Sequence, residues 1–161
     1  MGGEMKIKTS ELTGAALDLA VAKCEGFEID LITTGKRICV RNYEHEPFWV
    51  FCPSTSWEHG GPIIENENIT LVRCDDDYEV DRQGYTTNTR IPVWAAEHGG
   101  GHSEQSCYEG EHYYPPRYEV SVSDCCYGTT PLIAAMRCYV ASELGEEVEI
   151  PEELTVKREL T

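Results

Sequence analysis

The sequence predicts a single α+β domain in which an antiparallel sheet is flanked by an N-terminal and a C-terminal helix. Apolar residues at helical spacing occur near both ends of the chain, and strand-like runs bounded by turn residues fill the middle. A chain of 161 residues can bury one core but is short for two full domains. If the helices covered opposite faces of the sheet, the domain would be an α/β/α sandwich.

The first predicted helix covers residues 13–25. Thr13 suits the N-cap position, and Gly26 is suited to end the helix. Its apolar face, which would pack on the sheet, is formed by Leu17, Ala20, Val21 and Cys24, with Asp18 and Lys23 off it. This spacing is typical of an amphipathic helix.

Several strands are predicted between the helices. Ile29/Leu31 and Ile38/Val40 alternate on either side of residues 33–36, which indicates a hairpin with Gly35 in its turn. Residues 48–51 indicate a buried strand that Pro53 terminates. Further strands are predicted at residues 69–72, at residues 91–94 as a short edge strand, and at residues 117–122 as a half-buried strand.

Three segments lack such patterns. Residues 52–68 are rich in Ser, Gly, Pro and Asn, which predicts a loop. Carboxylates dominate residues 75–81, where an exposed strand or turn is expected. Residues 98–116 combine three consecutive glycines with a proline pair and have no apolar periodicity, so we expect a mobile loop.

The last helix has the clearest signals in the chain. Thr130 is expected to cap it, Pro131 occupies its first turn, and Gly145 stops it. Its apolar stripe consists of Leu132, Ile133, Met136, Tyr139, Val140 and Leu144. The tail after Gly145 is acidic and interrupted by Pro151, so we expect it on the surface or frayed. Residues 1–4 precede a strand-like Lys6-Ile7-Lys8 and are treated as an extension, so the domain covers residues 5–161.

Charge and cysteine content restrict the class of protein. The formal net charge is −16, which disfavours direct binding to nucleic acid through a basic surface. Eight cysteines would suit a secreted disulfide-rich protein, but Met1 to Lys6 lack the apolar segment of a signal peptide. We therefore expect reduced thiols and a cytoplasmic protein. No apolar run is long enough to span a membrane.

Three segments resemble the phage proteins called NinX-like, which carry a domain of unknown function. They are residues 5–18 (MKIKTSELTGAALD), 53–65 (PSTSWEHGGPIIE) and 128–142 (GTTPLIAAMRCYVAS), about a quarter of the chain. Residues 75–124 resemble the inserted strand-and-loop region of the longer family variants. The resemblance implies a phage or prophage accessory protein in the host cytoplasm, with no established catalytic motif or cofactor.

Residues 54–62 predict a ligand-binding loop. Ser54 and Thr55 offer hydroxyls, Gly60 and Gly61 let backbone amides approach a ligand, and Trp57 offers a stacking face. This set suits a small anionic or heteroaromatic molecule. The alternative is a tight loop in which Trp57 fills the core. Further predicted ligand-binding residues are Arg90, Trp94, Thr129, Thr130 and Arg137. Arg137 is expected to be half-buried with a carboxylate, a carbonyl or a phosphate as its partner, and a salt bridge to one of the many acids is the favoured alternative to a ligand.

Metal and thiol chemistry are weaker alternatives. His98, His102, Cys107 and His112 lie close together in sequence, but their spacings are not those of paired zinc ligands. Cys125 and Cys126 precede the last helix, yet no local pattern links either one to a histidine. We expect no catalytic residue and no metal.

Three functions remain open. The first is a non-enzymatic, homo-oligomeric protein that sequesters a small host molecule, of the nucleotide type, to counter host defence. The second is an acidic protein that mimics DNA and inhibits a host protein that handles nucleic acid. The third is a metal-dependent hydrolase that uses the loop from His98 to His112.

Overall fold

Helices and antiparallel strands are combined in one α+β fold, as predicted. The computed structural model describes residues 3–32, 37–74, 78–80, 86–90, 93–99, 102–103, 107–109, 112–114, 118–119 and 126–155. No helix among these residues is long and apolar enough to cross a membrane.

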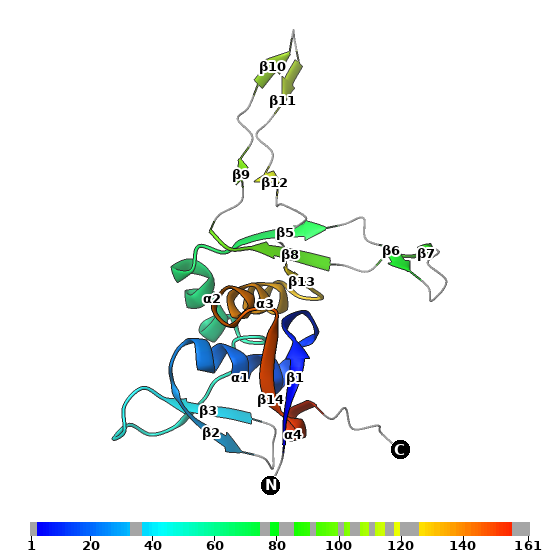
Figure 1. Ribbon diagram of the computed structural model, residues 1–161. Helices are drawn as coiled ribbons and strands as arrows, with labels where there is room; N and C mark the ends of the chain where they lie inside the picture. Colours follow the sequence, from blue (N-terminus) through cyan, green and yellow to red (C-terminus); the bar gives the residue numbers. More distant parts are fainter. Residues whose placement is uncertain are drawn as a thin grey trace.

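Three helices occupy the middle of the molecule (Figure 1). α1 (Gly14–Cys24) packs against α3 (Pro131–Leu144), and α2 (Trp57–Asn66) lies against α3. Every residue of α1 from Ala16 to Ala22 is buried, so the predicted amphipathic pattern is wrong although the helix itself is confirmed. Asp18, predicted to lie off the apolar face, is also buried. Short alanine side chains on both helices allow neighbouring elements to approach closely.

Small sheets surround the helices instead of one sheet lying between them. β13 (Cys126–Gly128), β8 (Val93–Glu97) and β5 (Thr70–Cys74) form a sheet next to α3. The sheet of β2 (Glu28–Ile32), β3 (Arg37–Arg41) and β4 (Trp49–Val50) lies next to α1 (Figure 1). The helices thus form the inner layer, which differs from the predicted flanking arrangement and from an α/β/α sandwich.

The two ends of the chain pair with each other. β1 (Glu4–Lys8) is antiparallel to β14 (Glu147–Pro151), and a short 3-10 helix, η1 (Thr9–Glu11), follows β1. Val148 and Ile150 of β14 are buried, so the expectation of a surface-lying or frayed tail is wrong for this segment. Glu4, set aside as part of an extension, belongs to β1. A helical turn, α4 (Glu152–Thr155), ends the described chain.

Two strand predictions need correction. The hairpin of β2 and β3 is confirmed, while its turn at residues 33–36 lies outside the described residues. β4 falls inside the predicted strand at residues 48–51, but Phe48, Trp49 and Val50 are partly exposed and only Phe51 is buried. The predicted edge strand at residues 91–94 corresponds to β8, which is the central strand of its sheet. Pro92 is compatible with this because β8 begins after it.

The segment predicted as a loop at residues 52–68 contains α2. Gly60, Gly61 and Pro62 all disfavour a helix, and Pro62 removes one internal hydrogen bond. Burial of Ile63 and of Gly60 against the rest of the core outweighs this unfavourable propensity. The strand predicted at residues 69–72 is confirmed as part of β5.

Residues 75–124 contain short paired strands. β6 (Tyr78–Val80) pairs with β7 (Thr86–Arg90), consistent with the strand-or-turn prediction for residues 75–81, of which 75–77 and 81 lie outside the described residues. β9 (His102–Ser103) pairs with β12 (Tyr118–Glu119), and β10 (Cys107–Glu109) with β11 (His112–Tyr114). The loop predicted over residues 98–116 therefore contains short paired strands. Of the strand predicted at residues 117–122, the structure describes only β12.

Candidate functional site

A shallow depression separates the turn before α2 from the first turn of α3. It has a volume of about 280 Å³ and is called here the Trp57 pocket; its lining consists of Ser54, Thr55, Trp57, Thr130, Pro131, Leu132 and Ile133. Four of the predicted ligand-binding residues, Ser54, Thr55, Trp57 and Thr130, therefore lie around one depression, although about 75 residues separate the two segments in the chain.

The turn before α2 is fixed by hydrogen bonds to two carbonyl groups. The amides of Thr55 and Ser56 donate to the Cys52 carbonyl oxygen at 3.2 and 2.9 Å. The Gly60 amide donates to the Ser56 carbonyl oxygen at 2.9 Å, which begins the helix. Trp57 is the first residue of α2 and remains 57% exposed, so the alternative in which it fills the core is wrong.

His59 holds the other end of this turn. Its Nδ1 accepts a hydrogen bond from the Cys52 amide at 3.1 Å and lies 3.5 Å from Cys52 Sγ. Because Nδ1 is an acceptor here, the neutral ring carries its proton on Nε2. Nothing in the sequence marks Cys52 and His59 as partners, because seven residues and a turn separate them.

Gly60 has a packing role in the structure. A Cβ atom at this position would lie 2.5 Å from the Pro53 carbonyl oxygen and 2.8 Å from Leu132 Cδ2. Only glycine therefore allows α2 to approach the start of α3 this closely. A Cβ at Gly61 would meet no atom within 4 Å. Neither glycine lines the Trp57 pocket.

A buried carboxylate supports the floor of the pocket. Asp18 is only 6% exposed, and its Oδ1 accepts a hydrogen bond from the Ser54 amide at 2.9 Å. Burial raises the pKa of Asp18 to about 6, although the amide and hydroxyl of Ser54 act in the opposite direction. The Ser54 hydroxyl lies near this carboxylate, yet Ser54 Oγ is buried without a hydrogen-bond partner of regular geometry.

The first turn of α3 forms the opposite wall. Thr130 Oγ1 accepts a hydrogen bond from the Ile133 amide at 3.2 Å, which confirms the predicted cap. The Ala134 amide donates to the Thr130 carbonyl oxygen, and Pro131 has no N–H group. In this turn the Leu132 amide thus stays available, at the positive end of the helix dipole.

Arg137 does not reach the Trp57 pocket. Its Nε donates to the Leu12 carbonyl oxygen at 2.9 Å and its Nη1 to the Tyr127 carbonyl oxygen at 2.8 Å. The guanidinium group therefore links α3 to Leu12, which follows η1, and to Tyr127 of β13. Its partners are carbonyl groups, one of the expected kinds, in place of the favoured salt bridge or a ligand. Burial lowers the pKa of Arg137.

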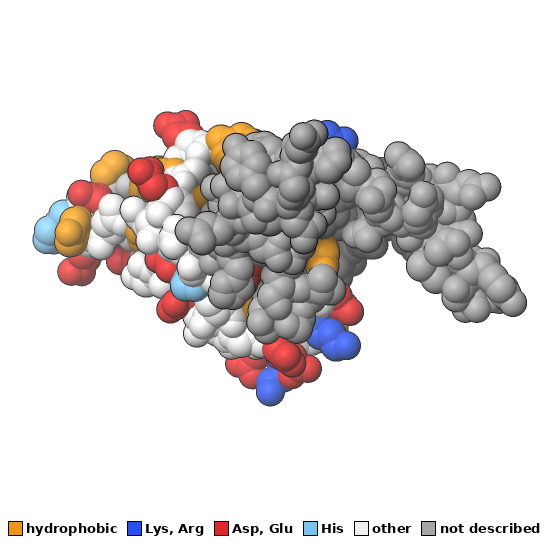
Figure 2. Space-filling model, turned by 90° about the horizontal axis from the view of Figure 1, so that it is seen from above, with side chains coloured by type: hydrophobic (Ala, Val, Ile, Leu, Met, Phe, Trp, Pro, Cys, Tyr) orange, Lys and Arg blue, Asp and Glu red, His pale blue; other side chains and the backbone are white. Residues whose placement is uncertain are grey.

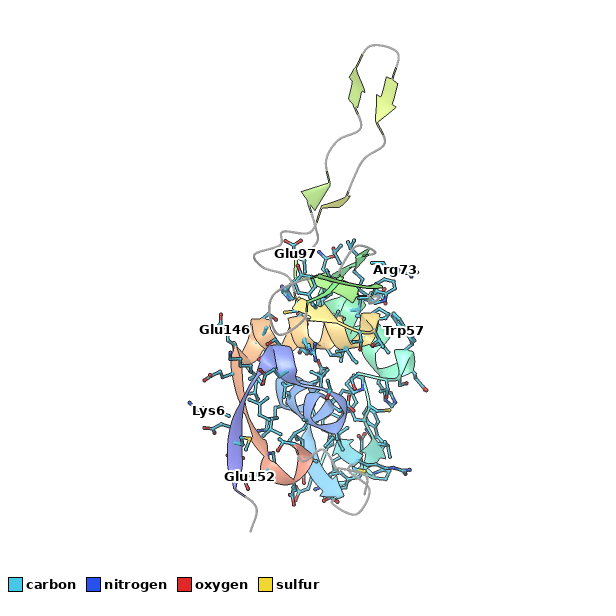
Figure 3. The ribbon with its side chains drawn as sticks, turned by 90° about the vertical axis from the view of Figure 1, so that its right-hand side faces the viewer. Lys6, Trp57, Arg73, Glu97, Glu146 and Glu152 are labelled. Carbon is cyan, nitrogen blue, oxygen red and sulfur yellow. The ribbon has the colours of Figure 1, made fainter. Side chains whose placement is uncertain are left out.

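The remaining predicted ligand-binding residues lie outside the pocket lining. Trp94 is half-buried in β8, where it pairs with Gly128 on one side and with Arg73 on the other. Thr129 is exposed and is not a lining residue, and the side chain of Arg90 lies outside the described residues. Figure 3 shows Arg73, which is not among the predicted residues, on the same side of the molecule as Trp57.

The predicted metal candidates are not assembled into a site in the described structure. His98 is exposed, and its Nε2 lies 3.2 Å from Glu67 Oε2. The side chains of His102, Cys107 and His112 lie outside the described residues, as does Cys125. Among the side chains that the structure describes, no group of three or more His, Cys, Asp or Glu residues could hold a metal ion.

Comparison with known proteins identifies one family. The family model described as "Bacteriophage P22, NinX" matches residues 8–105. This span includes most of the first segment and all of the second segment on which the resemblance was based, while residues 128–142 lie beyond it. Comparison with curated proteins gives no significant match.

Proposed function

Because this chain belongs to the bacteriophage P22 NinX family, we propose that it is a phage accessory protein that captures a small host molecule in the Trp57 pocket. The observation that carries the proposal is the indole of Trp57, 57% exposed at the rim of a depression lined by hydroxyl groups. Large aromatic side chains are usually buried, and an exposed indole offers a face on which a heteroaromatic ring can stack.

The opposite wall favours a negatively charged group. Thr130 and Leu132, both in the first turn of α3, line the pocket, so the positive end of the α3 dipole lies beside it. Arg73 lies on the same side of the molecule, close to the end of β5 (Figure 3). A ring beside Trp57 and an anion beside Leu132 are together the features of a mononucleotide. The pocket volume, about 280 Å³, lies just below the usual range of ligand pockets, which begins at about 300 Å³, and this favours a small ligand.

The proposal is binding without turnover. The lining residues supply hydroxyls, an indole and apolar surface, but no carboxylate, imidazole, amine or thiol. General acid-base and nucleophilic catalysis usually require such groups within hydrogen-bond reach of the substrate. Sequestration of a nucleotide-type signal would suit a protein that counters host defence from the host cytoplasm.

A homo-oligomer belongs to the same proposal. The depression is open on one side, and a second copy of the chain would enclose more of a bound molecule. Closed symmetric dimers are the commonest assemblies of this kind. Native mass spectrometry of the purified protein measures the subunit number and any retained molecule together.

Thermal unfolding in the presence of 5′-mononucleotides and cyclic mononucleotides tests the site. We expect one of these compounds to raise the melting temperature of the wild-type protein, and the Trp57→Ala variant to lose this rise. Tyr43→Ala is the matched control because Tyr43 is 71% exposed and lies outside the pocket lining. Equal shifts in the wild type and Trp57→Ala would contradict the assignment of the site, and no shift with any compound would contradict the ligand class.

A second function has support from charge alone. The net charge of −16 exceeds that of most small domains, and Figure 2 shows acidic side chains spread over the described part of one face with few basic ones between them. Such a surface suits a basic, nucleic-acid-binding host protein. Association with that protein would weaken steeply with added salt, whereas capture of a mononucleotide would not require a protein partner.

A further inference from the structure

Two cysteines face each other where β13 lies on α3. A Cβ atom at Gly128 would lie 2.4 Å from the Ala134 amide nitrogen, so strand and helix are in direct contact at this point. Cys126 is two residues before Gly128, and Cys138 is four residues after Ala134. Two residues along a strand cover about 6.6 Å, and four residues along a helix cover about 6 Å. Both steps return to the same face of their element, so Cys126 and Cys138 lie on the faces where Gly128 meets Ala134. This spacing agrees with the hydrogen bond between the side chains of Cys126 and Cys138.

The surroundings of Cys126 favour its ionised form. A hydrogen bond with the Cys138 side chain and the nearby charge of Arg137 lower the pKa of the Cys126 thiol, against the effect of burial. Arg137 is held there by its hydrogen bonds to Leu12 and Tyr127. Thiolates are the reactive form of cysteine, so this environment differs from that of an inert buried thiol.

Cys126 is also accessible. It lines a depression of about 300 Å³ together with Lys8, Thr9, Ser10, Ala141, Glu146 and Glu147. Figure 3 places Glu146 on the opposite side of the molecule from Trp57, so this depression is separate from the Trp57 pocket. Cys138 is only 4% exposed. One thiol of the pair thus faces a cavity, and the other lies behind it.

We propose that Cys126 and Cys138 form a peroxide-reactive thiol pair, in which Cys126 is the attacking thiol and Cys138 the resolving thiol. The Cys126 thiolate attacks the outer oxygen of a hydroperoxide, the O–O bond breaks, and the alkoxide or hydroxide leaves and takes a proton from solvent. Cys126 becomes a sulfenic acid. Cys138 then attacks this sulfur, the S–S bond forms, and the sulfenic hydroxyl leaves as water with the Cys138 proton.

This inference does not depend on the proposed ligand function. The disulfide would link β13 to α3 and close a loop of 13 residues that contains Thr130. Oxidation would therefore restrain the turn between the strand and the helix. Arg137 acts as a positioning residue for the thiol chemistry, since its charge lies beside Cys126 and its contacts are to backbone carbonyls.

Alkylation and oxidation of the native full-length protein test the pair. Cys24 is the internal reference, because burial and the charges of Glu143 and Glu25 raise its pKa to about 12. A pKa that is three units above the ordinary value lowers the fraction of thiolate about 1,000-fold. The greater nucleophilicity of the more basic thiolate offsets part of this loss. Iodoacetamide should therefore modify Cys126 at least about 30-fold faster than Cys24 at pH 7.5. Hydrogen peroxide at low molar excess should remove two hydrogens and yield a Cys126–Cys138 peptide.

Variants separate the two roles. Cys138→Ser should leave a sulfenic acid on Cys126 that dimedone traps, and Cys126→Ser should leave Cys138 reduced under the same conditions. Cys24→Ser should form the disulfide as the wild type does. Equal alkylation rates for Cys126 and Cys24 in the wild type would overturn the proposal without any variant. A peroxide-induced disulfide that joins other cysteines would overturn it as well.

Discussion

Asp18→Asn tests whether the carboxylate under the Trp57 pocket is destabilised by burial. Asp18 is 6% exposed, and burial raises its pKa from 3.8 to about 6. The asparagine keeps an acceptor oxygen for the Ser54 amide and removes the charge. Because a tenfold change in proton affinity is about 1.4 kcal/mol, the shift corresponds to about 3 kcal/mol between the protonated and ionised states.

The direction in which stability changes with pH follows from proton linkage. The folded protein binds this proton more tightly than the unfolded chain, so the stabilisation is fully present below pH 3.8 and is lost as the pH rises through about 6. Asp18→Asn has no carboxyl group to ionise at this position, so its stability does not fall in this way as the pH rises. The free energy of unfolding of Asp18→Asn relative to wild type should therefore rise by about 3 kcal/mol between pH 3.5 and 7.

Urea unfolding of both proteins at half-unit pH steps measures this difference. The other carboxylates titrate in both proteins and cancel in the comparison. The added NH₂ group costs about 1–3 kcal/mol if it finds no partner, but this cost does not vary with pH. A difference that stays constant from pH 3.5 to 7, or that falls as the pH rises, would refute the account of Asp18.

Two further predictions concern packing. Gly60→Ala should lower the free energy of unfolding by about 1–3 kcal/mol, because its Cβ would overlap the Pro53 carbonyl oxygen. Gly61→Ala should instead raise it by up to about 1 kcal/mol, because a Cβ there meets no atom and alanine has the better helix propensity. Equal effects of the two variants in chemical denaturation would contradict the close approach of α2 and α3. Arg137→Met should cost about 2–3 kcal/mol because two backbone carbonyls lose a charged donor, and it should leave any ligand-induced thermal shift in place. Loss of that shift in folded Arg137→Met protein would contradict the structural role of Arg137.

The sequence predicted best those elements whose signals are local. Thr130 and Gly145 mark the two ends of α3, and the Thr130 side chain caps it as expected. The alternation of Val148 and Ile150 with glutamates in β14 was also readable, but the acidic composition of the tail obscured it. Both signals lie within a few residues of the element that they define.

What the sequence could not predict depends on contacts between distant segments. Asp18 is buried because the Ser54 amide, 36 residues away, reaches its carboxylate. α2 forms despite Gly60 and Pro62 because the packed core offsets poor helix propensity. The juxtaposition of Trp57 and Thr130 was predicted from residue types, whereas the assignment of Arg137 to that site was wrong because its hydrogen-bond partners are backbone groups that no sequence pattern marks.

The most direct measurement of the ligand site is a ¹H–¹⁵N NMR titration of the labelled protein with the mononucleotide that gives the largest thermal shift. If the ligand binds in the Trp57 pocket, we expect saturable changes in the Trp57 indole and Leu132 amide signals, with the Cys126 amide unchanged. Saturable changes centred elsewhere, with the Trp57 indole and the Leu132 amide unaffected, would contradict it.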